Sequence, residues 1–554
     1  MPSKNCGIPS PTKTVSSSMS LATTRSRVSF DVVIVGCGAG GAVVAKKLAD
    51  AGLSVVVLEA GRRFIAERDY HSDQPDFPLN AGRIFQSPDD GLYTAGPKGF
   101  RYSRVRGVGG TTLVSWGVSP RLHASDFHVK DLDGIADNWP LTYEEVEPYY
   151  VEVEYELGMS GPAPNDQNPF DSPRSKPFPT PAHPMTKAGQ LFAAGARKLG
   201  LHPYVPALAM PTVPWDGRRA CIEAGACGYG CRIEAKSSAD VTYVRKAERT
   251  GRVEIRTSCM AREIALDSNG RAKSVVYFDQ NRTEHSVEAR AVVLAANAIE
   301  TPRLLLLSTS SRYPSGLANS SGLVGKYLLD HLDAGTLVYR EEPLEGWKGV
   351  PVSAMLQDFY ETNKRNPFVR GWLLEVSTGG SWPIALARRI GGWGSTHKAA
   401  MKRRFGHELS IFAQGEQIPD IRNQVLLDPT MTDHFGLPVP KILSEARGND
   451  FPMLKAMSQS IRELLTAMGV KEVLSEWSHQ PGASTHYMGS CRMGTDPRNS
   501  VVDRWGRAHD VPNLFIADGS TFVTGGAAHP TLTLMALAAR TSDYIIERFK
   551  TGDI

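Results

Sequence analysis

The sequence predicts an α/β protein organised around a parallel sheet, and three neighbouring segments lead to this prediction. Residues 31–36 form a short apolar run that is typical of a buried strand, and the run breaks into a glycine-rich turn. Residues 42–50 are rich in Ala, Lys and Leu without Pro, and they predict a helix that ends at Gly52. Residues 54–59 form a second apolar strand. In this order the segments predict a βαβ unit.

The glycine-rich turn of this unit suits the binding of a pyrophosphate. Gly36 permits the tight turn, Gly38 lets the backbone approach the phosphates, and Gly41 allows the helix to pack closely on the strand. Free N–H groups and the dipole at the helix N-terminus then hold the phosphates. Glu59 ends the second strand, where an acid accepts hydrogen bonds from a ribose 2′-OH and disfavours a 2′-phosphate. We therefore predict a Rossmann-type dinucleotide site, with an ordinary glycine-rich turn as the less favoured interpretation.

Length and composition limit the classes of protein that need to be considered. A chain of 554 residues is too long for one hydrophobic core, and we expect two domains. The net charge of +4 gives no reason to expect nucleic-acid binding, and no apolar run reaches the roughly 18 residues of a membrane span. Residues 1–28 are polar and predict a disordered tail without a signal sequence, so we expect a cytoplasmic protein. Seven scattered Cys residues do not describe a disulfide scaffold.

A second glycine-rich segment, residues 107–117, carries the first resemblance to a known family. Its glycines and hydroxyl side chains suit backbone contact with an extended polar ligand. Following the βαβ unit, it resembles the corresponding segment of the glucose-methanol-choline (GMC) oxidoreductases, a flavoprotein family. The resemblance covers residues 30–548 and implies that FAD lies along this segment. Ser115 stands where the family usually has Asn or His, and neither Val114 nor Ser115 is a histidine, so we expect FAD to be bound non-covalently.

Two surface insertions are expected in the first half of the chain, at about residues 62–106 and 130–220. Within the second insertion, Thr142 and Glu145 have the spacing of a capping box. This pair predicts the beginning of a surface helix.

Cys221, Cys227 and Cys231 form a small cysteine-rich segment. Their number invites a zinc or iron–sulfur interpretation, but the spacing lacks the C-x2-C pairs typical of such sites and no fourth ligand is evident nearby. We therefore predict no metal. We favour a partly buried cysteine-rich loop that resembles those of bacterial members of the family. The sequence does not decide whether a disulfide forms within it.

Residues 252–295 alternate apolar and polar side chains in short runs, which predicts a β-meander with a hairpin turn at residues 267–270. The meander returns through residues 291–295, an all-apolar run typical of a buried parallel strand. The residues that follow resemble a second family signature, with Asn297 where Gly is more usual. The resemblance also places the backbone of Ala261 against the adenine of FAD.

Residues 336–480 differ in composition and are expected to form an α+β substrate-binding domain. Four of the nine Trp residues lie in this part of the chain before position 400, which favours an aromatic-lined pocket or lid: Trp347, Trp372, Trp382 and Trp393. Residues 376–407 contain six Lys or Arg and no acid. Such a stretch could lie on a membrane or receive an acidic redox partner, but a solvated, mobile face is the commoner explanation.

Residues 481–554 are predicted to return to the FAD-binding domain. Asp518 and Gly519 end an apolar strand, where they suit a phosphate or ribityl contact. Pro530 is well placed in the first turn of a long helix, whose positive N-terminus would stabilise a reduced flavin lying before it. Taken together, the motifs and the resemblance imply the following cofactor contacts: Gly36, Gly38, Ala39, Gly41, Glu59, Ala60, Gly109, Gly110, Thr111, Thr112, Val114, Ser115, Ala261, Asp518, Gly519, Pro530 and Thr531.

Two histidines near the end of the chain, His486 and His529, match the catalytic pair of the family. An imidazole with an ordinary pKa of about 6.5 can be neutral at working pH and act as a base. We expect His486, in an irregular loop, to be the base, and we expect the following helix to lower the pKa of His529 and keep it neutral. His509 lies in a turn and is expected to be structural.

These observations predict an FAD-dependent alcohol oxidoreductase, with residues 29–335 forming most of its FAD-binding domain. A substrate CH–OH group would lose its proton to a histidine and its hydride to flavin N5, giving an aldehyde or ketone. The sequence does not decide among sugars, polyols, amino sugars and other alcohols as substrate. It also leaves open whether the electron acceptor is oxygen, a quinone or a redox protein. Because fold does not fix function, a lyase or a light-driven fatty-acid decarboxylase is the alternative. An NADH-using flavoprotein and an inactive flavin-binding protein are less favoured.

Overall fold

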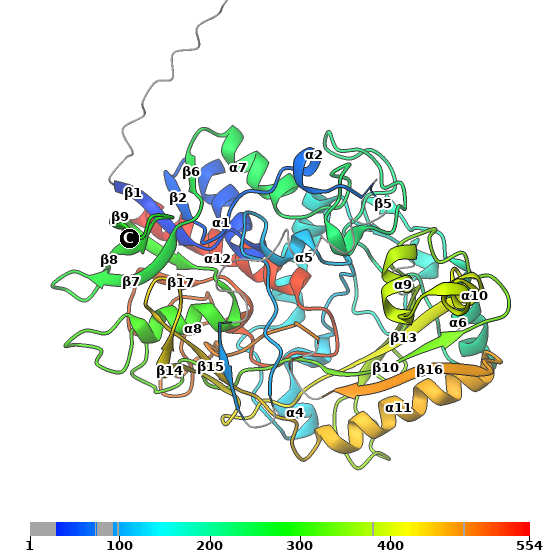
Figure 1. The fold of residues 1–554 in the computed structure, drawn as a ribbon. Coiled ribbons are helices and arrows are strands. Elements are labelled where there is room, and N and C mark those ends of the chain that lie inside the picture. Colours follow the sequence, from blue (N-terminus) through cyan, green and yellow to red (C-terminus); the bar gives the residue numbers. More distant parts are fainter. Residues whose placement is uncertain are drawn as a thin grey trace, which may run out of the picture.

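The computed structural model describes residues 29–72, 74, 92–96, 99–378, 382–479, 482 and 484–554. The predicted disordered tail, residues 1–28, lies outside the described residues. Two large sheets dominate the molecule, and Figure 1 shows them on opposite sides of its centre.

The first sheet has seven strands in the order β6–β2–β1–β9–β8–β7, and β17 also pairs with β9. Its parallel part consists of β1 (Ser29–Val35), β2 (Val55–Leu58), β6 (Val253–Arg256), β17 (Leu514–Ile516) and the end of β9 (Glu284–Leu294). β2, β17 and the end of β9 are fully buried, which explains their continuous apolar sequences. α1 (Ala39–Asp50) joins β1 to β2 and packs against α12 (Thr531–Thr551). The predicted βαβ unit and the α/β fold class are confirmed.

The antiparallel part of the sheet is a meander of β7 (Met260–Leu266), β8 (Ala272–Phe278) and β9. Its first turn lies where the sequence predicts it, because the N–H of Asp267 donates to the carbonyl of Arg271 across 2.9 Å. β6 departs from the prediction. Although it falls in the range expected for the meander, it follows α7 (Arg245–Arg249) and pairs in parallel with β2. A strand reached through a helix can run parallel to its neighbour, whereas a hairpin strand cannot.

The second sheet is antiparallel, in the order β11–β12–β13–β10–β16. Its strands are β10 (Leu332–Tyr339), β11 (Val352–Leu356), β12 (Trp372–Ser377), β13 (Glu408–Gly415) and β16 (Glu472–His479). α6 (Lys187–Lys198) and α11 (Asp450–Ala467) pack on it and bury a separate apolar cluster. Figure 1 shows α11 running along the strands. The predicted domain boundary at residues 335 and 336 falls inside β10, and the limits of the domains stay a prediction.

Smaller elements complete the fold. α5 (Tyr143–Leu157) begins at the predicted capping box, in which the N–H of Thr142 donates to Glu145 Oε2 across 3.0 Å. α8 (Asn297–Leu307) packs against a small sheet of β14 (Gln424–Thr432), β15 (Pro438–Leu443) and β3 (Thr94–Ala95). The described residues also form the short helices α2 (Ala66–Asp69), α4 (Val129–Asp133), α9 (Pro383–Ile390) and α10 (Gly394–Arg404) and the short strands β4 (Ser160–Gly161) and β5 (Thr180–Pro181).

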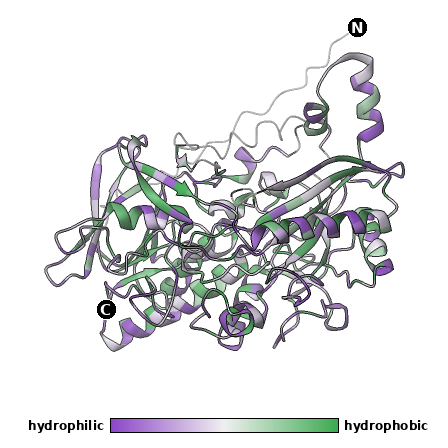
Figure 2. Ribbon diagram, turned by 90° about the horizontal axis from the view of Figure 1, so that it is seen from below, coloured by the Kyte–Doolittle hydropathy of each residue, from purple (hydrophilic) through white to green (hydrophobic). Residues whose placement is uncertain are grey.

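Hydrophilic residues gather in peripheral loops and on outer helix faces (Figure 2). The predicted basic stretch forms part of this periphery, where α9 and α10 pack against each other and Trp393 is 90% exposed. Among the described helices, none combines the length and apolar character needed to cross a bilayer.

Candidate active site

A cavity of about 570 Å³ lies where the first sheet faces the second. Gly36 after β1, Glu59 after β2, Ala295 after β9 and Asp518 after β17 all line it. Four parallel strands therefore end at its wall. The region beyond the carboxyl ends of such strands is where open α/β sheets bind their ligands.

The glycines of the βαβ unit allow the backbone to come this close. A Cβ atom on Gly40 would lie 1.8 Å from the carbonyl oxygen of Ala517, and one on Gly41 would lie 2.0 Å from that of Gly36. Gly36 itself has φ +98°, and a Cβ there would lie 2.4 Å from the Ala295 oxygen. Any side chain at these positions would push α1 away from the strands. The glycines thus hold the N-terminus of α1 at the edge of the cavity.

The N-terminus of α1 fits a phosphate group. No side chain caps this helix, and its first turn contains no acid. The first N–H groups of a helix have no partner within the helix, so here they can donate to an anion. Glu59 lies nearby and accepts hydrogen bonds from the N–H groups of Cys37 (2.8 Å) and Gly61 (2.9 Å). Each carboxylate oxygen keeps further lone pairs, which can accept from a ribose hydroxyl.

Most of the predicted cofactor residues line this one cavity. They are Gly36, Gly38, Ala39, Glu59, Ala60, Gly110, Thr111, Thr112, Val114, Ser115, Ala261, Asp518, Gly519, Pro530 and Thr531. Gly41 and Gly109 are not part of its wall. Gly41 serves the packing of α1, and Gly109 joins the two glycine-rich segments, because its N–H donates to the Cys37 carbonyl across 2.8 Å.

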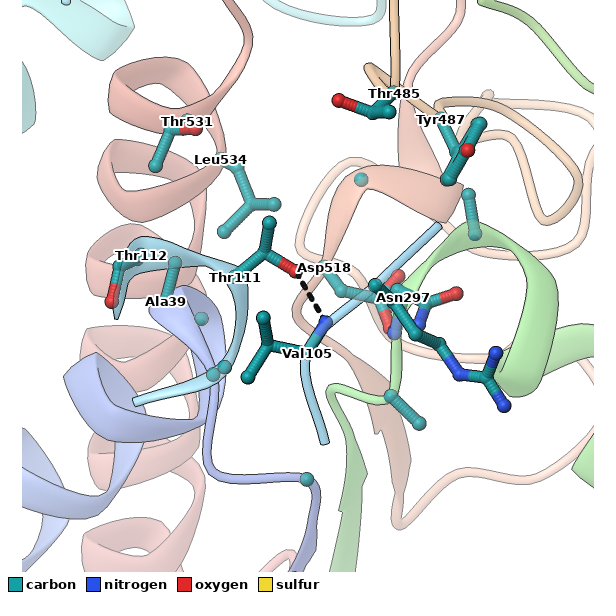
Figure 3. Close-up of a pocket in the computed structure, with 18 of the residues that line it drawn as sticks. Ala39, Val105, Thr111, Thr112, Asn297, Thr485, Tyr487, Asp518, Thr531 and Leu534 are labelled. Atoms are coloured by element: carbon teal, nitrogen blue, oxygen red, sulfur yellow. Dashed lines mark hydrogen bonds between the residues drawn. The ribbon is translucent and has the colours of Figure 1, made fainter. Parts of the chain in front are cut away.

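Figure 3 shows how the two sides of the cavity face each other. Thr111 and Thr112 come from the second glycine-rich segment, and Asp518 and Asn297 lie across from them. Asn297 has φ +82°, a backbone conformation that favours glycine, which explains why the related signature usually has Gly there. The Asp518 carboxylate is fixed by hydrogen bonds from the Asn297 N–H (3.0 Å), the Thr301 hydroxyl (2.5 Å) and the Ser520 N–H (2.9 Å).

The two predicted catalytic histidines lie side by side, with the ring centres of His486 and His529 5.0 Å apart. Both line the cavity. A third histidine, His331, packs against His486 with its ring centre 5.1 Å away. Asp330 holds the loop of His486 in place by accepting its backbone N–H across 2.9 Å.

His331 determines which nitrogen of His486 carries the proton. His331 Nε2 lies 2.9 Å from the carbonyl oxygen of Gly526, and its Nδ1 lies 2.9 Å from His486 Nδ1. A carbonyl oxygen can only accept, so the proton of a neutral His331 sits on Nε2 and its Nδ1 accepts from His486. The neutral His486 therefore carries its own proton on Nδ1. Its Nε2 keeps a lone pair, as a general base requires.

Burial keeps all three imidazoles neutral. It lowers the pKa of His486 well below the ordinary value, and neighbouring His529 and His331 lower it further. Burial followed by His331 lowers the pKa of His529 to about 3, and burial also lowers that of His331. The expected neutrality of His529 is found, but the expected cause needs correction. Pro530 caps α12, which begins only at Thr531, and burial rather than the helix is the main cause.

His529 also contacts the second sheet. Its Nε2 lies 3.3 Å from Gln414 Nε2 and 3.5 Å from Glu375 Oε2. Burial and then Asp333 raise the pKa of Glu375 to about 8. Glu375, Gln414 and Asp333 all line the cavity beside the histidine pair.

The cysteine-rich segment lies behind the second glycine-rich segment. Lys236 is buried, and its ammonium group donates to the carbonyls of Cys227 (2.8 Å), Leu113 (2.7 Å) and Ser115 (3.0 Å). Cys221 and Cys227 are free thiols whose pKa values burial raises to about 11 and about 12. The third, Cys231, is also free, so the disulfide that the sequence leaves open is not formed.

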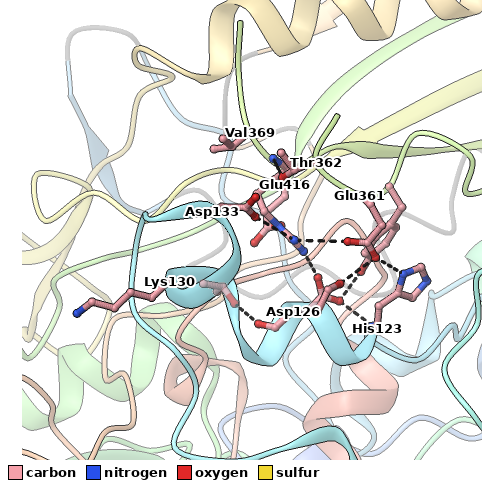
Figure 4. Close-up of polar contacts among 12 residues, drawn as sticks. His123, Asp126, Lys130, Asp133, Glu361, Thr362, Val369 and Glu416 are labelled. Atoms are coloured by element: carbon pink, nitrogen blue, oxygen red, sulfur yellow. Dashed lines mark hydrogen bonds and ion pairs between the residues drawn. The ribbon is translucent and has the colours of Figure 1, made fainter. Parts of the chain in front are cut away.

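A buried charge cluster, part of which is drawn in Figure 4, adjoins Gly526. Arg370 is 1% exposed and pairs with Asp126 and with Glu416, the latter across 2.6 Å. The Tyr360 hydroxyl donates to the same Asp126 carboxylate across 2.7 Å. A Cβ on Gly526 would lie 2.7 Å from this hydroxyl. Tyr360 and Asp126 of this cluster therefore lie against the backbone of Gly526, whose carbonyl accepts from His331.

Sequence reasoning missed four residues near the histidine pair: His331, Asp333, Glu375 and Gln414. A signal existed for the first two, because they are polar residues in the otherwise apolar segment 328–334 beside Asp330. Glu375 and Gln414 carry no local signal. Only the pairing of β12 with β13 brings them to the cavity.

Comparison with known proteins agrees with this geometry. The family model for GMC oxidoreductases matches residues 30–333 and 419–538. The 2-methyl-1,2-propanediol dehydrogenase of Mycolicibacterium austroafricanum is 35% identical over 95% of this chain and 97% of its own length. The fructose dehydrogenase large subunit of Gluconobacter japonicus is 32% identical over 95% of this chain and 99% of its own length.

A solved structure of formate oxidase from Aspergillus oryzae RIB40 shares the fold. It has a TM-score of 0.66 at 15% identity and covers 95% of this chain and 99% of its own. The glycine-rich cradle, the open helix N-terminus and the acids at the strand ends fit FAD, the cofactor of the matching family. The chain therefore belongs to the GMC oxidoreductase family and is an FAD-dependent oxidoreductase.

Proposed function

We propose that this enzyme oxidises a primary or secondary alcohol of the sugar, polyol or related CH–OH class to an aldehyde or ketone. His486 acts as the base that takes the hydroxyl proton on Nε2, and His529 orients the same hydroxyl. FAD, when bound, supplies the hydride acceptor. The names of the two relatives, a diol dehydrogenase and a sugar dehydrogenase, support this substrate class.

The observation that carries the proposal is the hydrogen-bonded chain from Gly526 through His331 to His486. It gives His486, a residue that lines the cavity, one defined tautomer in which Nε2 is unprotonated. The lowered pKa of His486 means that this form persists across the physiological pH range. A neutral base in a defined tautomer suits proton abstraction from an alcohol.

The remaining residues hold the cofactor and shield the reaction. The N-terminus of α1 and Glu59 would bind the pyrophosphate and ribose, and Asp518 with Thr111 would bind the ribityl and phosphate region. Trp116 and Phe412 line the substrate end, and their rings pack 6.0 Å apart. Their apolar surface limits the access of water to the histidine pair.

The test is anaerobic reduction of the bound flavin, followed by its loss of absorbance in a stopped-flow instrument. His486→Ala should slow reduction by alcohol about 10²–10⁴-fold, the usual contribution of a general base, and should leave the flavin spectrum unchanged. His509→Ala is the matched control. His509 is hydrogen-bonded to Ser500 across 2.8 Å and lies outside the cavity wall. The flavin of this variant should therefore be reduced at the wild-type rate.

Unchanged reduction in His486→Ala would remove this residue from the mechanism. Failure of every alcohol to bleach the wild-type flavin would refute the proposed reaction itself. The electron acceptor is determined by reoxidising the reduced enzyme with oxygen, a quinone or a redox protein and comparing the three rates.

A further inference from the structure

The second sheet presents a group of polar side chains to the substrate end of the cavity. Glu375 on β12 pairs with Phe412 on β13, and Asp333 on β10 pairs with Gln414 on β13. Phe412 and Gln414 are two residues apart, so they share one face of the sheet. All four line the cavity. The opposite face carries the apolar residues that pack on α6 and α11.

Several polar atoms in this group have no hydrogen-bond partner among the described residues. They are Glu375 Oε2, Gln414 Oε1 and, on the adjoining ring, His529 Nδ1. All three are buried, and buried polar atoms in proteins are nearly always hydrogen-bonded. Their position beside the histidine pair indicates that groups of the substrate are their partners.

We propose that Glu375, Gln414 and Asp333 bind the hydroxyl groups of an uncharged polyol or sugar next to its reacting CH–OH, and that they exclude substrates bearing a carboxylate. This inference rests on the proposed alcohol oxidation and narrows its substrate class. The names of the diol and fructose dehydrogenases are consistent with it.

The groups around Glu375 disfavour an anionic ligand and suit one whose hydroxyls both donate and accept hydrogen bonds. Three groups that the structure describes face Glu375: Asp333 on β10, His529 in the loop just before α12 and, at longer range, Tyr204. With a pKa raised to about 8, Glu375 is mostly protonated at neutral pH, so it can both donate to and accept from a hydroxyl. The Gln414 amide has the same double capacity. An ammonium group would be attracted to Asp333, but it only donates, so it would leave the donor groups of Glu375 and Gln414 without acceptors.

An anionic substrate would find no compensating charge. The arginines that line the described cavity are Arg104, Arg106 and Arg303, and each has Glu300 within 4.0 Å as an ion-pair partner. No lysine or arginine contacts Glu375 in the described part of the chain. A substrate carboxylate would instead lie near Asp333, and like charges brought together in this way cost several kcal/mol, as at protein interfaces, which corresponds to at least about a hundredfold in affinity.

The test uses three C6 compounds that differ in one group: sorbitol, gluconate and 1-amino-1-deoxysorbitol. Each is assayed with an artificial dye as acceptor on the FAD-loaded enzyme, and 1-propanol is included as a simple alcohol. We expect sorbitol to have the highest kcat/KM of the three and gluconate to be lower by at least about a hundredfold. A higher kcat/KM for gluconate or for the aminated compound than for sorbitol would overturn this inference.

Two variants test the residue assignment. Glu375→Leu should raise the KM for sorbitol about tenfold or more, because hydroxyl partners are lost, and should lower the preference for sorbitol over 1-propanol. Glu375→Gln keeps both hydrogen-bonding functions and should retain the sorbitol KM. In the wild type, kcat/KM for sorbitol should fall above pH 8 as Glu375 ionises, and Glu375→Gln should remove this fall.

Glu408→Gln is the matched control. Glu408 lies on β13 but pairs with Arg389 and Arg404 outside the cavity wall, so its variant should keep the wild-type preference. If Glu375→Leu does not yield a folded yellow protein, Gln414→Leu serves the same comparison. If Glu375→Leu, or Gln414→Leu in its place, has the same KM for sorbitol as the wild type, the assignment is refuted. Failure of all alcohols, 1-propanol included, would instead refute the proposed function.

Discussion

Replacement of His331 provides the most direct test of the way this site prepares its base. His331 accepts from His486 Nδ1 and donates to the Gly526 carbonyl, both across 2.9 Å. His331→Leu removes both partners and leaves two buried polar groups unpaired. His486 can then place its proton on either nitrogen, and only one of the two forms has a free Nε2.

The size of the effect follows from the hydrogen bond to His486. Leaving a buried polar group without its partner costs about 1–3 kcal/mol. If that amount is lost from the reactive tautomer, flavin reduction by alcohol slows roughly 10–100-fold, since 1.4 kcal/mol corresponds to about tenfold. This is a smaller loss than expected for removal of His486 itself.

His331→Gln separates proton placement from packing. Its amide nitrogen can donate to the Gly526 carbonyl and its amide oxygen can accept from His486, so the original polarity is kept. Stopped-flow reduction should therefore be slow in His331→Leu and mostly restored in His331→Gln. Equal loss in both variants would show that His331 acts only by filling space, and no loss in either would refute the tautomer argument.

Three further predictions follow from other parts of the structure. Glu59→Arg should lose FAD, measured as flavin absorbance per protein, because a cation replaces the acceptor of two backbone N–H groups; full occupancy would contradict the assigned adenosine end. Arg370→Met should lower the free energy of unfolding in urea by about 3–5 kcal/mol, because it leaves Asp126 and Glu416 as buried unpaired acids; a change below about 1 kcal/mol would contradict the role of the cluster. The free energy of unfolding should fall as the pH is lowered from 7 to 5, because His529 has a folded pKa of about 3 and in this range takes up a proton only in the unfolded chain. This protonation stabilises the unfolded chain by about 2 kcal/mol at pH 5. His529→Gln should show a correspondingly smaller pH dependence, and an identical one would refute this assignment.

The parts of the fold that the sequence predicted are those determined by local patterns. The glycine-rich turn, the alternation of the meander and the capping box at Thr142 each involve residues within a few positions of one another. Local spacing determines the backbone in such cases. β6 was misassigned because its partner, β2, lies almost two hundred residues earlier, and no local feature distinguishes a parallel edge strand from a meander strand.

The candidate site divides in the same way. His486 and His529 lie in motifs that resemble those of a family, so they could be named in advance. Glu375 and Gln414 reach the cavity through the register of antiparallel strands that are far apart in sequence, and a shift of one residue would turn both away from it. The cause of the low pKa of His529 also depends on burial, which sequence alone does not reveal.

The pairing of the long strand β9 determines how late in synthesis the cofactor site can form. This strand pairs with β1 from the start of the chain and with β17 from near its end, and a Cβ on Gly40 would meet the residue directly after β17. α1 also packs against α12, which ends at Thr551. The ribosome releases the chain from its N-terminus, so the phosphate-binding turn emerges long before the elements that cover it. Cofactor binding therefore has to wait for β17 and α12, and the phosphate-binding turn stays uncovered while the residues between are synthesised.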